Sequence, residues 1–116
     1  MMGKKHYYFV GIGGAGMSGI ARVLLQLGYE VSGSDLRLSE STRRLAQAGA
    51  TIYEGHRESN LQPDIDTVVV SSAIPQDNPE VVKAQSLGIP ILHRADMLGK
   101  LMERQKGFVI AGAHGK

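Results

Sequence analysis

A glycine-rich turn near the start of the chain limits what the sequence can fold into. The stretch Gly11-Ile12-Gly13-Gly14-Ala15-Gly16 directly follows the apolar run Tyr7-Tyr8-Phe9-Val10, and it fits G-x-G-x-x-G where a first strand would turn into a first helix. Glycines let the backbone approach a bound group closely, and the free N–H groups and dipole of a helix start attract negative charge. The turn therefore predicts a diphosphate-binding corner; the alternative is a tight strand-to-helix turn that binds nothing.

An acidic residue stands where this fingerprint expects one. Asp35 ends the alternating run 29–34, which indicates a second strand, about 20 residues beyond the last glycine of the turn. A carboxylate at this point accepts hydrogen bonds from ribose hydroxyls. The alternative is that Asp35 turns the chain or caps a helix. On these features the ligand is a diphosphate joined to a ribose, and NAD, FAD and UDP-sugars all fit.

Composition narrows the class of protein. The 116 residues, of which 42% are hydrophobic and 21% charged, predict one folded globular domain. A net charge of +2 gives no support for a nucleic-acid or membrane partner. The chain has no cysteine, which excludes disulfides and thiolate metal sites and is compatible with a cytoplasmic location. No apolar run approaches the roughly 18 residues that a membrane-spanning helix needs.

Strand and helix patterns alternate along the whole chain. Apolar and β-branched runs predict six strands, at residues 7–10, 29–34, 51–53, 67–70, 89–92 and 108–111. Helical spacing, caps and stops predict helices around residues 20–27, 40–48, 79–87 and 95–104. This alternation predicts an α/β, Rossmann-like, doubly wound parallel sheet with helices on both faces and strand order 3-2-1-4-5, the sixth strand lying alongside or leading away. A ligand would then bind outside the carboxyl ends of the first and fourth strands.

Further polar residues follow the later strands. Ser71-Ser72-Ala73 comes directly after the fourth strand and should face the glycine turn, where the hydroxyls could donate to phosphate or sugar oxygens or satisfy a local turn. His56 follows the third strand and could approach a ligand, whereas His6 is expected at the surface. The Arg and Lys residues outside these motifs are expected on solvated helix faces. No two of the four histidines have metal-ligand spacing, so we predict no metal site built by the protein.

The chain ends on a second glycine-rich stretch. Ala111-Gly112-Ala113-His114-Gly115-Lys116 follows the sixth predicted strand, and Gly-Lys is the centre of a phosphate-binding loop. The match is incomplete, because Ile110 stands at the first glycine position and no Ser or Thr follows Lys116. Such a loop works only when a helix follows it, so we expect the chain to be a piece of a longer protein. The alternative is an ordinary polar tail.

Four stretches of the chain, taken in order, carry a family resemblance. They are residues 11–21 (GIGGAGMSGIA), 32–35 (SGSD), 69–74 (VVSSAI) and 111–116 (AGAHGK). Together they resemble the N-terminal region of the Mur ligases of bacterial peptidoglycan synthesis, in the branch that adds L-alanine to UDP-N-acetylmuramate. The resemblance covers essentially the whole chain. One departure is Ala113, where family members more often carry Thr.

The resemblance implies a substrate-binding domain over residues 1–106. In that reading the glycine turn holds the diphosphate of UDP-N-acetylmuramate, Asp35 contacts the uridine end, and the segment after the fourth strand lines the diphosphate and sugar. The residues assigned to the sugar nucleotide are Gly11, Gly13, Gly14, Ala15, Gly16, Met17, Ser18, Asp35, His56, Ser71, Ser72 and Ala73.

The resemblance implies a different role for residues 107–116, as the first strand and truncated phosphate loop of an ATP-binding domain that is absent from the chain. The residues assigned to ATP are Gly112, Ala113, His114, Gly115 and Lys116. Lys116 is the catalytic candidate, because it would lie on the β- and γ-phosphates. ATP, Mg²⁺ and L-alanine would be bound with the absent domains, so no cofactor is built into this piece and it is expected to be inactive alone.

Two other functions fit parts of the pattern. The NAD-binding domain of an oxidoreductase would use the same glycine turn and Asp35, although it has no need of His114-Gly115-Lys116. The related Mur ligase that attaches a whole tripeptide to the same sugar nucleotide would share the first domain, although Gly13-Gly14-Ala15-Gly16 fits the L-alanine branch better.

Overall fold

Five parallel strands form one sheet in the order β3-β2-β1-β4-β5. The computed structural model describes residues 5–112, with the backbone alone for residues 104–112. The strands are β1 (His6–Val10), β2 (Glu30–Asp35), β3 (Thr51–Glu54), β4 (Thr67–Val70) and β5 (Ile91–His93). The helices are α1 (Met17–Gln26), α2 (Glu40–Gln47), α3 (Pro79–Leu87) and α4 (Arg94–Gly112), with a 3₁₀ turn η1 (Glu58–Asn60). The predicted α/β class and strand order 3-2-1-4-5 are confirmed.

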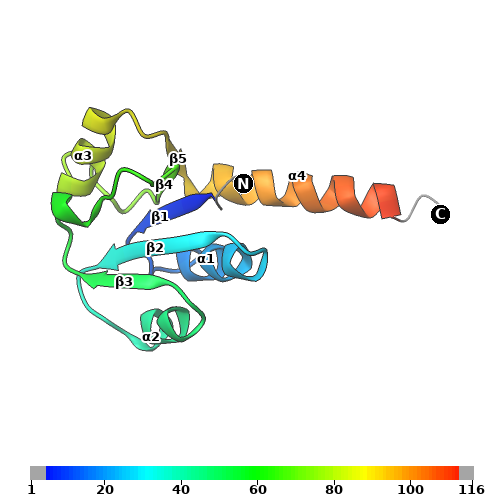
Figure 1. Ribbon diagram of the computed structural model, residues 1–116, viewed down its shortest axis with the longest axis horizontal. Helices are drawn as coiled ribbons and strands as arrows, with labels where there is room; N and C mark the ends of the chain where they lie inside the picture. Colours follow the sequence, from blue (N-terminus) through cyan, green and yellow to red (C-terminus); the bar gives the residue numbers. More distant parts are fainter. Residues whose placement is uncertain (1–4, 113–116) are drawn as a thin grey trace.

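Two hydrophobic clusters cover the two faces of the sheet. Alternate residues of β1 divide between them, because successive side chains of a strand point to opposite faces. Phe9 packs with residues of α1, α2 and α4, whereas Tyr8 and Val10 pack with Ala84 of α3 and with Leu61 beyond η1. Helices therefore lie on both faces, and α4 runs out beyond the rest of the domain (Figure 1).

Local sequence sets where two of the helices begin. Ser39 caps α2 by accepting a hydrogen bond from the amide of Thr42, and the hydroxyl of Thr42 accepts one from the amide of Ser39. Asn78 caps α3 by accepting from the amide of Glu80 at 2.8 Å, with Pro79 as the first helical residue. These caps satisfy amides that have no partner inside the helix.

The predicted sixth strand, residues 108–111, is wrong. These residues belong to α4, which continues to Gly112. A strand needs a neighbouring strand to pair its backbone N–H and C=O groups, whereas a helix pairs them within itself. Among the described residues, β5 ends the sheet and pairs with β4 alone, so no strand stands beside residues 108–111.

Three apolar side chains within the predicted helices lie at the surface. Leu27, Leu98 and Met102 are exposed, whereas Met97 and Leu101 of α4 are buried. Leu27 is the residue that caps the end of α1, so it lies beyond the turns that pack on the sheet. The fifth strand begins two residues later than predicted, at Ile91, because Pro90 has no N–H to give to a ladder.

Replacing Gly33 of β2 by alanine should destabilise the fold. A Cβ at this position would lie 2.6 Å from the carbonyl oxygen of Phe9 and 2.8 Å from Cβ of Ile12, so β1 and β2 would have to move apart. We expect a loss of about 1–3 kcal/mol in the free energy of unfolding, measured by urea denaturation. Gly99→Ala in α4 is the control, because a Cβ there meets nothing within 4 Å, and it should be neutral or stabilising. Equal stability of both variants would contradict the close approach of the two strands.

Candidate functional site

The glycine turn joins β1 to α1 and is held in place by β2. The amides of Gly11 and Ile12 donate to the carbonyl oxygen of Ser34 at 2.8 and 2.9 Å. The amide of Gly14 donates to the carbonyl oxygen of Gly11 at 3.0 Å. Gly11 and Gly16 have φ of +82° and +79°, values that side chains strongly disfavour. The shape of the turn is therefore set by its own glycines and by the end of the neighbouring strand.

Helix α1 begins without the caps that α2 and α3 have. Its N-cap residue is Gly16, no side chain accepts from the first amides, and the first turn has no acidic residue. Within the described part of the chain, the amides of Ala15 and Gly16 make no hydrogen bond. Uncapped amides at a helix start, with the positive end of the helix dipole behind them, suit an anion.

Asp35, at the end of β2, is bonded to the glycine turn. Its Oδ2 accepts from the amide of Gly13 at 2.8 Å, and its Oδ1 accepts from the amide of Leu36 at 2.8 Å. A Cβ on Gly13 would lie 2.8 Å from Oδ2, so glycine is needed for this approach. Asp35 thus stabilises the turn, as the alternative reading of the sequence expected. A carboxylate has about four lone pairs, so two donors leave it able to accept further hydrogen bonds.

An open pocket of about 480 Å³ adjoins this carboxylate. It lies between the β2–α2 loop, α2 and β3, and is lined by Leu38, Ser39, Thr42, Arg43, Ala46 and Ile52. A methyl carbon of Thr42 and Oδ2 of Asp35 lie 2.9 and 2.8 Å from the point that a Cβ on Gly13 would occupy, so the pocket and the carboxylate are adjacent. The pocket wall is largely apolar, which suits a flat ring better than a phosphate.

The other predicted residues at this edge come from β3 and β4. Because parallel strands end at one edge, His56 and the segment 71–73 lie at the same end of the sheet as the glycine turn. Ser71 is half-buried and its Oγ accepts from the amide of Ala73 at 3.3 Å, as a local turn would require. Ile74 reaches to 3.4 Å from the Cβ position of Gly11, which brings the β4 loop against the turn.

Arg94 also reaches the glycine turn, and the sequence reasoning missed it. It is the first residue of α4, directly after β5, and its Nη1 lies 3.0 Å from the position that a Cβ on Gly16 would take. The prediction of a solvated helix face is therefore wrong for this side chain, which is half-buried. Its position after a strand was the available signal, because every strand end of a parallel sheet faces the same edge.

A buried carboxylate lies behind the site, and the sequence reasoning missed this residue too. The Glu80 side chain, at the start of α3, is 0% exposed. Its Oε2 accepts from the Tyr8 hydroxyl at 2.7 Å, the Asn60 amide at 2.8 Å and the Arg57 backbone at 3.0 Å, and its Oε1 accepts from the Ser34 hydroxyl at 2.6 Å. Burial, with Glu80 beside it, raises the pKa of the Tyr8 hydroxyl above its ordinary value. The network joins β1, β2, the η1 segment and α3.

His56 is part of this network. Its Nδ1 lies 2.7 Å from Oγ of Ser34 and 3.6 Å from Oε1 of Glu80, and its side chain is 12% exposed. His56, which follows β3, therefore lies at the carboxyl edge of the sheet as predicted. Its Nδ1 points into the protein.

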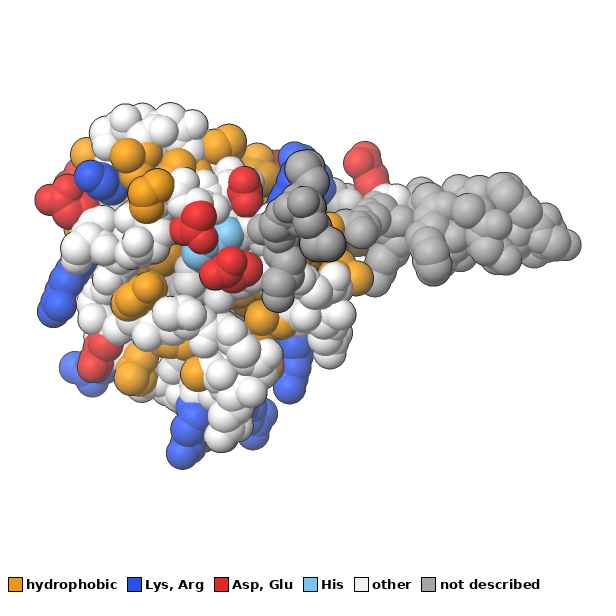
Figure 2. Space-filling view, in the orientation of Figure 1, with side chains coloured by type: hydrophobic (Ala, Val, Ile, Leu, Met, Phe, Trp, Pro, Cys, Tyr) orange, Lys and Arg blue, Asp and Glu red, His pale blue; other side chains and the backbone are white. Residues whose placement is uncertain are grey.

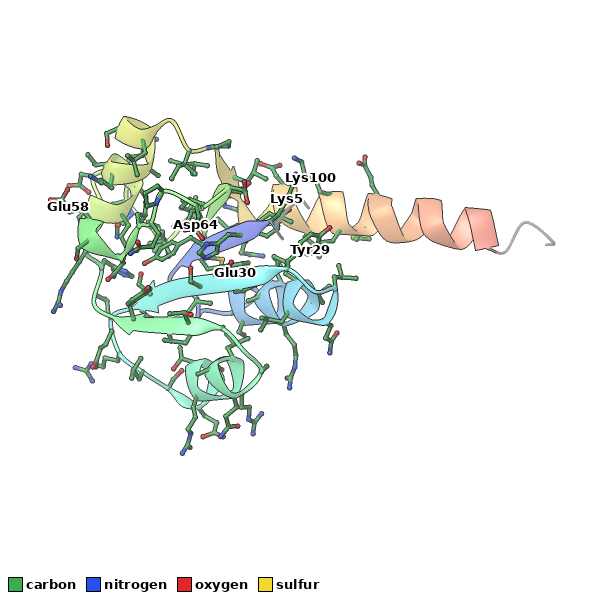
Figure 3. The ribbon with its side chains drawn as sticks, in the orientation of Figure 1. Lys5, Tyr29, Glu30, Glu58, Asp64 and Lys100 are labelled. Atoms are coloured by element: carbon green, nitrogen blue, oxygen red, sulfur yellow. The ribbon has the colours of Figure 1, made fainter. Side chains whose placement is uncertain are left out.

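At the opposite end of the sheet, His6 is buried, contrary to the prediction of a surface position. Its Nε2 lies 2.6 Å from Oγ of Ser32, and its Nδ1 lies 3.1 Å from Asp64 and 3.9 Å from Glu30. Figure 2 shows acidic side chains gathered around a histidine on this face, and Figure 3 labels Glu30 and Asp64. Among the described residues, His6, Glu30 and Asp64 are the one group of side chains whose ligand atoms lie close enough together to hold a cation. This group lies away from the glycine turn.

The predicted ATP residues fall at the end of the chain. Gly112 is the last residue of α4, and Ala113, His114, Gly115 and Lys116 lie outside the described residues. Over residues 5–112, no helix is long and apolar enough to cross a membrane.

The chain is similar to known proteins in both sequence and fold. Residues 6–106 match the Mur ligase family, catalytic domain. The UDP-N-acetylmuramate–L-alanine ligase of Pelotomaculum thermopropionicum is 58% identical over 113 residues, covering 97% of this chain and 24% of that protein. Among solved structures, the UDP-N-acetylmuramate–alanine ligase of Thermotoga maritima has a TM-score of 0.83 at 36% identity, covering 87% of this chain and 23% of that one.

A second solved structure extends the likeness within the family. A murein peptide ligase from Psychrobacter arcticus has a TM-score of 0.77 at 31% identity, covering 83% of this chain and 20% of that one. The chain spans about a quarter of the length of the curated relatives it matches, 24% in the Pelotomaculum protein. The family match covers residues 6–106, which include the sheet, the glycine turn and the buried carboxylate. The chain belongs to the Mur ligase family.

Proposed function

We propose that this chain is the UDP-N-acetylmuramate-binding domain of an ATP-dependent ligase that joins L-alanine to that sugar nucleotide. The observation that carries the proposal is the uncapped start of α1, with the amides of Ala15 and Gly16 unbonded and the guanidinium of Arg94 beside them. An anion at this corner would replace the missing cap. The similarity to ligases named for UDP-N-acetylmuramate favours a UDP-sugar as the source of that anion.

Each part of the proposed ligand would have a counterpart at the carboxyl edge of the sheet. The diphosphate would accept from the α1 amides and from Arg94, which can donate two hydrogen bonds in parallel. Asp35 would accept from the ribose hydroxyls while it keeps the turn in shape, and the adjoining pocket would take the uracil ring. Ser71 and Ser72 would face the sugar beyond the diphosphate.

The remaining chemistry would be supplied by parts that follow this domain. Residues 107–116 would lead into the ATP-binding domain, with Lys116 on the transferred phosphoryl group and Mg²⁺ bound there. Transfer to the muramoyl carboxylate would give an acyl phosphate that the amine of L-alanine attacks, with the developing charge clamped electrostatically. The chain has no cysteine, which is compatible with the cytoplasmic location that we propose for the enzyme.

The 116-residue chain should therefore give no turnover. Incubation with UDP-N-acetylmuramate, L-alanine, ATP and Mg²⁺ should release no phosphate above the rate without protein, because the clamp on the transferred phosphoryl group needs the second domain. A phosphate-release assay measures this. Turnover that follows the concentration of the chain would contradict the proposed division of labour.

The family offers one competing substrate pair. The chain is also similar to a murein peptide ligase, so the competing function is a ligase that attaches a peptide to the same sugar nucleotide. Both versions bind the sugar nucleotide through this domain, so the choice between them lies with the acceptor site elsewhere in the protein. An NAD-dependent oxidoreductase is not favoured, because the family match covers residues 6–106.

Binding of UDP, not NADH, should distinguish these classes. In a calorimetric titration of the chain, UDP should bind, and NADH at equal concentration should neither bind comparably nor compete. The reason is that the proposed site is shaped for a uridine diphosphate. Tight NADH binding that UDP fails to displace would overturn the sugar-nucleotide assignment in favour of the oxidoreductase.

Replacing Arg94 by alanine should weaken UDP binding without unfolding the chain. The loss of a charge-assisted hydrogen bond is worth about 1.5–3 kcal/mol, which corresponds to an affinity lower by about 10–150-fold. Lys100→Ala, an exposed cation on the same helix, is the matched control and should leave the affinity unchanged (Figure 3). If both variants bind UDP equally well, Arg94 is not a diphosphate ligand.

A further inference from the structure

We propose that Glu80 is a positioning residue for His56: through the hydroxyl of Ser34 it holds the imidazole as the Nδ1–H tautomer and leaves Nε2 as a hydrogen-bond acceptor. The tautomer follows from the contacts of the buried network. The use of Nε2 by a ligand rests on the proposed function.

The first step is that Glu80 carries no proton. Three groups donate to its Oε2: the Asn60 side-chain amide, the Arg57 backbone amide and the Tyr8 hydroxyl. Amide N–H groups can only donate, so Oε2 carries no proton. The other oxygen, Oε1, accepts from the Ser34 hydroxyl at 2.6 Å. All four of these hydrogen bonds are donated to Glu80, as a carboxylate requires.

The second step is the single proton of the Ser34 hydroxyl. Oγ lies 2.6 Å from Oε1 of Glu80 and 2.7 Å from Nδ1 of His56. A hydroxyl has one proton to give and lone pairs that accept. Because the carboxylate takes the proton, Oγ accepts from His56, and Nδ1 must carry a hydrogen. A neutral imidazole with Nδ1–H has a lone pair on Nε2.

The third step is what this lone pair can contact. Phosphate oxygens accept hydrogen bonds, so they do not pair with an unprotonated Nε2, whereas a hydroxyl or a ring N–H does. The amide of Gly55, directly before His56, donates to the carbonyl oxygen of Asp35 at 2.7 Å. The backbone just before His56 therefore runs beside the end of β2, while the side chain of His56 turns to Ser34 and that of Asp35 turns to the glycine turn. The geometry points to a hydroxyl or N–H of the nucleoside, not the diphosphate, as the partner of His56.

The E80Q variant should reverse the direction of the hydrogen bonds from His56 through Ser34 to residue 80, and so tests this proton relay. An amide has one acceptor and one donor end, and the three donors at Oε2 require the carbonyl oxygen on their side. The amide N–H then faces Ser34 and donates to Oγ, so the Ser34 proton turns to Nδ1 of His56. The imidazole should change from Nδ1–H to Nε2–H.

Long-range ¹H–¹⁵N NMR spectra of the ligand-free chain report this change. At a pH where the imidazoles are neutral, wild-type His56 should show a protonated-type shift at Nδ1 and an unprotonated-type shift at Nε2, and E80Q should show the reverse. The His56 signal is assigned by its loss in His56→Gln. His6, at the opposite end of the sheet, is the internal control and should keep its shifts. Wild-type His56 in the Nε2–H form would overturn the proposal, whether or not the E80Q variant folds.

A second variant separates positioning from support of the fold. Tyr8→Phe removes one donor to Glu80 and leaves the Ser34–His56 contact, so it should lower stability but keep the Nδ1–H tautomer. The same reversal in Tyr8→Phe as in E80Q would mean that general loosening, not the proton relay, sets the tautomer.

Binding measurements then test the ligand side. E80Q should weaken UDP binding about tenfold, the scale of one hydrogen bond, and leave inorganic pyrophosphate binding unchanged. An equal loss for both probes would overturn the nucleoside assignment of His56. If the wild-type chain binds no UDP, the proposed function fails, while the tautomer in the ligand-free chain still decides the role of Glu80.

Discussion

Ser34 joins the glycine turn to the buried carboxylate, and the candidate site depends on this joint. Its carbonyl oxygen accepts the amides of Gly11 and Ile12, so the end of β2 holds the first half of the turn. Its hydroxyl, fully buried, donates to Glu80 on the other face of the sheet. The backbone that would receive a phosphate and the side chains behind it therefore share one residue, and a shift of β2 would move both.

Two charged features lie at this edge, the carboxylate of Glu80 and the positive end of the α1 dipole, and the fold satisfies only the first. An isolated buried carboxylate is expensive, and Glu80 is tolerated because four donors surround it. The two amides just before α1, those of Ala15 and Gly16, are left unbonded, although a capping side chain is typically worth about 1 kcal/mol. One site is fully satisfied within the chain and the other is satisfied best by an anion from outside, which is the division expected between a rigid support and a binding corner.

Local patterns predicted the parts of the structure that depend on neighbours in sequence. The glycine turn, the approximate positions of α2 and α3 and the strand order follow from spacing, turn residues and βαβ handedness. The sixth strand failed because the apolar run 108–111 suits either a strand or a helix, and strand formation needs a partner that the pattern cannot supply. The predictions that His6 and Arg94 lie at the surface were wrong for a related reason, because burial depends on which distant segments pack against a residue.

The sequence alone determined the α/β order, the glycine-rich βα corner and the family, because these depend on residue types at short, fixed spacings. Tertiary structure alone decided which side chains surround that corner. In the sequence, Glu80 is one acid in the first turn of a helix, where it would normally lie in solvent near the positive helix end. It becomes the centre of the network because β1, β2 and the η1 segment bring their donors to it from as many as 72 residues away, a distance over which sequence spacing carries no geometric information.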